Sequence, residues 1–150
     1  MRKTFFIAAV CVLVSVSIVC QEKFQPLNVK TGQWQVTETY KSSEMPAPHT
    51  ITFKSCVTKE GLSSNPFNDK EQRCDWHVVT SDGTDMELKA TACSLNPKMG
   101  MTAAVHFNLH AVDSEHVNGS GEWTMTGNGM NMKGNATGNG QWVSATCSGD

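Results

Sequence analysis

Four cysteines, spread among short segments of alternating apolar and polar residues, constrain this chain most strongly. Cys56, Cys74, Cys93 and Cys147 remain once the first twenty residues are set aside. Alternation with a period of two is typical of β-strands that have one buried and one solvated face. An even number of separated cysteines in a small chain is typical of a disulfide framework. The sequence therefore predicts an exported all-β domain that is stapled by two disulfides.

The first twenty residues predict a secretory signal peptide. Arg2 and Lys3 form a positive start, and residues 5–20 form an apolar stretch that is too short for a membrane span. Cys20 lacks the small preceding residue that lipidation requires, so we expect no lipid anchor there. We therefore expect a single mature domain, residues 21–150, in the periplasm or outside the cell and without a membrane span.

The charge of the mature chain argues against nucleic-acid binding. The full chain has 12 basic and 14 acidic side chains, and removing the signal peptide takes away two basic ones, so the formal charge becomes 10 − 14 = −4. The remaining Lys and Arg residues are scattered and form no basic stripe for phosphates. No nucleophile, base and orienting partner occur together at a familiar spacing, so we expect neither an enzyme nor a cofactor.

The alternation predicts about eight strands. The predicted strands cover residues 32–41 and 50–56, a segment around Trp76 and Val78, Met86–Ala92, Met99–Ala111, Val117–Met125, Met130–Ala136 and a short segment at Trp142 and Val143. Glu38 is the one polar residue on the apolar face of the first strand. Residues 58–73 are irregular, with room for one helical turn near residues 59–62.

An antiparallel meander of this length leaves two unpaired edges unless the sheet closes. We therefore expect an up-and-down barrel or a strongly curved sheet. Glycines on the inward face of the sixth and seventh predicted strands favour either tight curvature or room beside the tryptophans.

The strongest hairpin signal predicts one disulfide pair. Residues 81–84 form a Ser-Asp-Gly-Thr turn, which places Cys74 opposite residues 90–93, so Cys74 and Cys93 are the predicted partners. Cys56 then pairs with Cys147 by elimination, although four cysteines allow three connectivities. The alternative of a four-cysteine zinc site lacks any Cys-x-x-Cys pair.

Two motifs carry a family resemblance. The segment from Lys30 to Thr37 reads Lys-Thr-Gly-Gln-Trp-Gln-Val-Thr, and Cys56 is followed by Val-Thr-Lys-Glu. With the later single cysteines, this pattern resembles the bacterial DUF3617 family over nearly the whole mature chain. It departs at Thr31, where that family usually has proline, and in the three residues after Cys147. The resemblance implies a small exported bacterial protein of unknown function, and it carries over no catalytic residues.

The aromatic residues suggest a binding role. The predicted inward aromatic residues that would line an apolar cavity are Trp34, Phe53, Trp76, Phe107, Trp123 and Trp142. A barrel interior of this kind accepts an apolar ligand, although the simpler interpretation is that the side chains fill it themselves. We expect a non-enzymatic envelope protein that binds an apolar small molecule or a protein partner.

Methionines provide the alternative, a periplasmic protein that handles copper or another soft metal. The candidate thioether ligands are Met99, Met101, Met130 and Met132, with His106 and His110 nearby in sequence. However, the methionines of the fifth predicted strand share a face with Val105 and Phe107, and the two histidines lie on the opposite face. Core packing therefore explains the methionines better.

Overall fold

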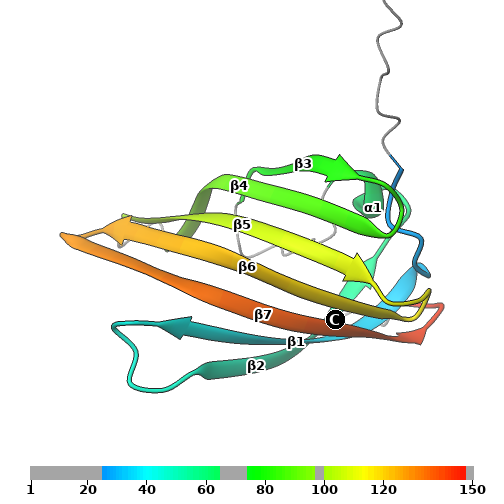
Figure 1. Cartoon of the computed structure of the whole chain (residues 1–150), viewed down its shortest axis with the longest axis horizontal. Helices are drawn as coiled ribbons and strands as arrows, with labels where there is room; N and C mark the ends of the chain where they lie inside the picture. Colours follow the sequence, from blue (N-terminus) through cyan, green and yellow to red (C-terminus); the bar gives the residue numbers. More distant parts are fainter. Residues whose placement is uncertain (1–24, 65–73, 97–99, 148–150) are drawn as a thin grey trace, which may run out of the picture.

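The computed structural model describes residues 25–64, 74–96 and 100–147, and within them seven strands form one antiparallel sheet. The order of the strands is β2-β1-β7-β6-β5-β4-β3 (Figure 1). The strands are β1 Gly32–Ser42, β2 His49–Val57, β3 Trp76–Ser81, β4 Asp85–Asn96, β5 Met101–Ala111, β6 His116–Gly127 and β7 Met130–Ser144, and a single helical turn, α1 Gly61–Ser64, follows β2. The predicted all-β antiparallel architecture is confirmed.

Of the two predicted forms, the structure shows the strongly curved sheet, and one detail of the predicted strands needs correction. The sheet curves strongly but does not close, because the described residues of the edge strands β2 and β3 do not pair with each other (Figure 1). The seventh and eighth predicted strands are one strand, β7. Its Gly138 and Gly140 continue the ladder opposite Glu38 and Val36 of β1, so the Gly-Asn-Gly sequence there is not a turn.

Two other turns have the residues that their geometry requires. Asn128 and Gly129 join β6 to β7 with positive φ values of 50° and 76°, which is the backbone that Asn-Gly hairpins favour. Asp82 accepts hydrogen bonds from the backbone N–H groups of Thr84 and Asp85 at 2.9 and 2.8 Å, and so fixes the β3–β4 turn.

The core lies on the inner face of the curved sheet. Its main buried cluster consists of Leu27, Leu62, Met86, Leu88, Phe107, Leu109 and Ala136. Two of these residues come from outside the sheet. Leu27 belongs to the N-terminal segment, which hydrogen-bonds to the β3–β4 turn through Asn28 N and Gly83 O at 2.7 Å, and Leu62 belongs to α1. These two short segments therefore cover one end of the inner face.

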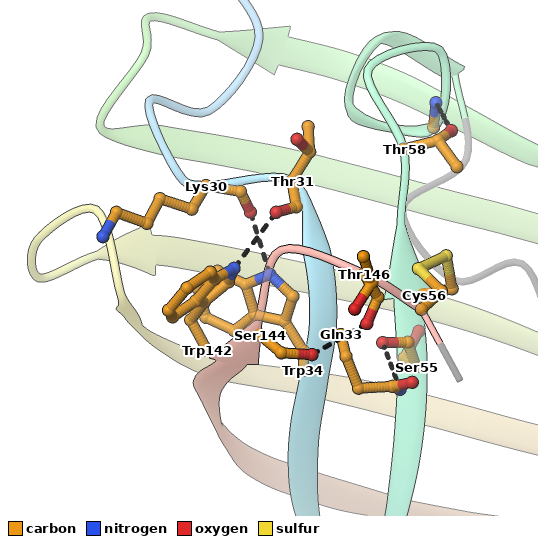
Figure 2. Close-up of a disulfide and its surroundings, with 12 residues drawn as sticks. Lys30, Thr31, Gln33, Trp34, Ser55, Cys56, Thr58, Trp142, Ser144 and Thr146 are labelled. Atoms are coloured by element: carbon orange, nitrogen blue, oxygen red, sulfur yellow. Dashed lines mark hydrogen bonds between the residues drawn. A yellow bond between two sulfur atoms is a disulfide. The ribbon is translucent and has the colours of Figure 1, made fainter.

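Both predicted disulfides are confirmed. Cys74, just before β3, is bonded to Cys93 of β4, and Cys56 of β2 is bonded to Cys147 after β7. To reach Cys56, the C-terminal segment crosses β1 (Figure 2). Gly32 permits this crossing, because its φ is +125° and a Cβ atom there would lie 2.2 Å from the carbonyl oxygen of Ser144.

Candidate functional site

The inner face holds a small apolar pocket between β1, β2, α1 and the central strands. Its volume is about 70 Å³. One water molecule needs roughly 10–15 Å³ measured in this way, and a site for a drug-sized ligand has several hundred Å³. The apolar residues that line it are Val29, Trp34, Val36, Val57, Leu62, Phe107, Leu109 and Val117. The pocket therefore has room for a slender apolar group, such as an alkyl chain.

Glycines form the floor of this pocket. Gly138 and Gly140 of β7 lie beneath side chains of β1. A Cβ atom on Gly138 would lie 3.4 Å from Cγ of Glu38, and one on Gly140 would lie 3.3 Å from the Trp34 ring. On β6, a Cβ atom at Gly119 would lie 2.5 Å from the Phe107 ring. Of the two roles predicted for inward glycines, room for neighbouring large side chains is the one these distances show.

Glu38 is the one ionisable side chain among the described residues that line the pocket. It lies on the apolar face of β1, and the hydroxyl of Tyr40 donates a hydrogen bond to its carboxyl group. Burial raises the pKa of Glu38 above its ordinary value of 4.5, and the hydrogen bond from Tyr40 offsets only part of this shift. Burial and the neighbouring carboxyl group also raise the pKa of Tyr40 well above 10.0, so its hydroxyl stays a donor.

The apolar surface continues from the pocket to the edge of the sheet. Phe53 and Ile51 of β2 lie directly opposite Val36 and Glu38 of β1, and therefore on the same face. Each of these two side chains is 37% exposed. We call the inner face of β1 and β2, together with the pocket against it, the open half of the sheet, and the inner face of β3 and β4 the packed half.

The Lys30–Thr37 motif, which leads into β1, holds the end of the sheet together through hydrogen bonds and a cation–π contact. The indole N–H of Trp34 donates to the Lys30 carbonyl at 2.9 Å, and that of Trp142 donates to the Thr31 carbonyl at 3.0 Å (Figure 2). The Lys30 ammonium group lies 4.6 Å from the centre of the Trp142 ring and also forms a salt bridge with Glu115. These contacts fix the Trp34 ring, which is 3% exposed, as a wall of the pocket.

The other predicted cavity residues lie in different places. Trp34 and Phe107 line the pocket, whereas Phe53 lies at the β2 edge. Trp76 packs against both buried clusters, and Trp142 lies under Lys30 at the end of the sheet. Trp123 lies over Gly134 and borders a separate hollow of about 250 Å³, and its buried Nε1 has no acceptor within the described part of the chain.

The described residues do not assemble a metal site from histidine, cysteine or carboxylate groups of three or more. His106 and His110 lie on the outer face, where their ring nitrogens are 2.8 Å from carboxylate oxygens of Glu87 and Asp85. Met101 lies on the inner face of β5, away from both histidines, and Met130 and Met132 lie on β7. Met99 lies outside the described residues.

The sequence predicted the aromatic walls but missed what the polar residue in the pocket does. Glu38 stood out because it interrupts an apolar face. Tyr40, two residues further along the same face, was the available signal for a partner, since residues i and i+2 of a strand lie side by side. Leu27 and Leu62 gave no signal, because neither belongs to a periodic segment.

Comparison with known proteins identifies the family. The model of the family described as "Protein of unknown function (DUF3617)" matches residues 29–147. The chain belongs to the DUF3617 family. No curated protein and no solved structure matches it. In this DUF3617 protein the matched region starts beside Lys30 and ends at Cys147, so it includes the motif at the end of the sheet and both disulfides.

The disulfides also indicate where the protein works. Two disulfides in a chain of 150 residues are typical of an oxidising, non-cytoplasmic environment. In residues 25–64, 74–96 and 100–147, no helix has the length and apolar character that crossing a membrane requires.

Proposed function

We propose that this DUF3617 protein is an exported, non-enzymatic binding protein whose pocket takes up the apolar part of a small molecule. The observation that carries the proposal is the glycine-floored apolar pocket in the open half of the sheet. A small domain normally fills its interior with its own side chains, as the packed half does here. An apolar space that is left beside such packing favours a ligand.

The surface around the pocket supports the same function. The exposed Phe53 and Ile51 extend the apolar surface beyond the pocket, so a ligand longer than the pocket keeps an apolar contact as it emerges. Exposed large apolar side chains that adjoin a pocket favour a binding role over a purely structural one. The small volume restricts the bound part to a slender group such as an alkyl chain.

The polar groups of the pocket favour binding over catalysis. Glu38 and Ser55 both line it, but Ser55 lies opposite Trp34, four cross-strand pairs along the β1–β2 ladder from Glu38. A nucleophile and its base need to be within hydrogen-bond distance, and these two side chains lie at different levels of the sheet. The predicted signal peptide and the two disulfides support a location in the periplasm or outside the cell.

Native mass spectrometry of the mature protein, purified from the cells that make it, tests this proposal. We expect an adduct with the mass of a small apolar molecule. Gly138→Val should remove the adduct, because the new side chain fills the pocket floor beside Glu38. Thr137→Val is the matched control, since Thr137 is exposed on the opposite face of the same strand and the substitution keeps its shape.

Three results would contradict the proposal. The first is a wild-type protein that carries no adduct and binds no added alkyl compound. The second is an adduct that survives unchanged in a folded Gly138→Val variant, which would place the ligand elsewhere. The third is an adduct with the mass of copper or of a protein subunit, which would favour the soft-metal alternative or a protein partner.

A further inference from the structure

In the open half of the sheet, one acidic side chain lies beside the space that the end of an apolar ligand would occupy. Glu38 lines the pocket between the apolar Val36 and the ring of Tyr40, and exposed Ile51 lies directly opposite it on β2. In the part of the chain that the structure describes, no salt bridge involves Glu38. Within residues 25–64, 74–96 and 100–147, the Tyr40 hydroxyl provides its one side-chain hydrogen bond. The pocket thus contains a carboxyl group that has no positive partner among the described residues.

A carboxylate in apolar surroundings is costly unless it gains a counter-charge or further hydrogen bonds. Burial raises the pKa of Glu38, which shows that the surroundings disfavour its charged form. A positively charged group on the ligand would supply the missing partner. A negatively charged group would instead meet a like charge, in a mature chain whose formal charge is already −4 (10 − 14 after residues 1–20 are removed).

We infer that the pocket selects amphiphiles with a cationic ammonium-type head, whose head lies beside Glu38 and whose alkyl chain lies among Val36, Val57, Leu109 and Val117. This inference rests on the proposed function, because it needs the pocket to hold an alkyl chain. It adds the chemical class of the ligand. Fatty acids with the same chain are the class that Glu38 excludes.

The arrangement of Tyr40 fits a head group that donates hydrogen bonds. Its hydroxyl donates to the Glu38 carboxyl group, so it holds that group in one orientation. A carboxylate has about four acceptor positions on its two oxygens, and one hydrogen bond leaves the others for a ligand. An ammonium group has three donors, and it combines those hydrogen bonds with the opposite charge.

Three ligands with the same eight-carbon chain test the inference. Isothermal titration calorimetry of the mature protein at neutral pH compares octylamine, octanol and octanoate. We expect octylamine to bind at least about tenfold more tightly than octanoate, with octanol between them. The ratio in the wild-type protein is informative without any variant.

Two variants that each remove one negative charge locate the source of the preference. Glu38→Gln keeps the shape of the side chain, and we expect the octylamine affinity to fall about tenfold while octanol binding stays within about twofold. Glu122→Gln is the matched control, because Glu122 is exposed on the outer face of β6, opposite Asn135. It should leave the order of the three ligands unchanged.

The outcomes separate the two proposals. If octanol binds but octylamine is no tighter than octanoate, or if Glu38→Gln and Glu122→Gln have the same effect, the head-group inference is wrong and the pocket proposal stands. If none of the three ligands binds the wild-type protein, the proposed function fails as well. Tyr40→Phe keeps the carboxyl group but removes the hydrogen bond that orients it, so it should weaken the preference for octylamine less than Glu38→Gln does, and a larger loss than with Glu38→Gln would count against Glu38 as the selecting group.

Discussion

The two halves of the inner face obey the same alternating pattern but reach different packing. In the packed half, Met86, Leu88, Ala90 and Cys93 are at most 2% exposed. In the open half, Ile51 and Phe53 are each 37% exposed beside the pocket. Alternation therefore determines which face of a strand is apolar, whereas the residues that cover this face decide whether it is filled. We interpret the packed half as the part that provides stability and the open half as the part that binds.

Removing either disulfide should change the stability more than any other substitution considered for the two halves. Cys56 of β2 and Cys147 close a loop of 91 residues that contains β3–β7, and Cys74 and Cys93 close a loop of 19 residues at the packed half. From loop entropy we expect the Cys56→Ala/Cys147→Ala variant to lose about 4–5 kcal/mol of unfolding free energy, and the Cys74→Ala/Cys93→Ala variant about 3 kcal/mol. Urea denaturation measures both, and a larger loss at the shorter loop would contradict the entropic explanation.

Leucine truncation in the two environments is the next largest effect. Leu88 of β4 is 0% exposed within the packed half, whereas Leu109 of β5 lines the pocket. Leu→Ala in a core costs about 2–5 kcal/mol, and the cost is highest where neighbours surround the side chain completely. We expect Leu88→Ala to lie near the top of this range and Leu109→Ala near the bottom. Equal losses in urea denaturation would mean that the pocket is as well packed as the rest of the core.

The fold was predictable from the sequence as far as local patterns determine it. The alternation of Trp34, Val36 and Tyr40 with polar residues predicted which face of β1 points inward. The turn at residues 81–84 predicted the pairing of Cys74 with Cys93. The open edges were not predictable, because closure depends on the curvature accumulated over all seven strands. The continuity of β7 was missed because Gly-Asn-Gly favours a turn unless partner strands pair with both sides of it.

Adding a methyl group to an inward glycine should have an intermediate effect on stability, and it distinguishes a closely packed position of the inner face from the floor of the pocket. A Cβ atom at Gly121 would lie 2.3 Å from the carbonyl oxygen of His106, whereas one at Gly138 would be 3.4 Å from its nearest neighbours. We expect Gly121→Ala to destabilise the protein by about 1–3 kcal/mol, because backbone must move. Gly138→Ala should stay within about 1 kcal/mol of the wild type. Thermal unfolding of both variants checks this, and similar melting temperatures would contradict it.

The pH dependence of Glu38 is the smallest expected effect. Its pKa in the folded protein is raised above 4.5, so the folded state holds this proton more tightly than the unfolded state does. Its contribution to stability is therefore fully present below about pH 4.5 and is lost as the pH rises through the folded-state pKa. Relative to the wild type, Glu38→Gln should gain stability between about pH 4 and pH 7. Urea denaturation at both pH values measures the gain, and a constant difference would contradict the burial of this carboxyl group.

The candidate site was predictable only in part, for a physical reason. Alternation placed Trp34 and Phe107 on the inner face, but only three-dimensional packing shows that they border an unfilled space. Two further walls, Val29 and Leu62, come from segments without periodicity. Glu38 was visible as a polar interruption, yet its role depends on Tyr40 beside it and Gly138 beneath it.

A methyl NMR titration of the mature protein with octanol shows directly where an apolar ligand binds. The methyl groups of Val36, Val57, Leu109 and Val117 line the pocket, and those of Leu88 lie in the packed half. We expect saturable shifts of the pocket methyl signals while the Leu88 signals stay in place. Shifts that centre on Leu88 or on the outer face, or no saturable shifts at all, would contradict the claim that the open half of the sheet is the binding site.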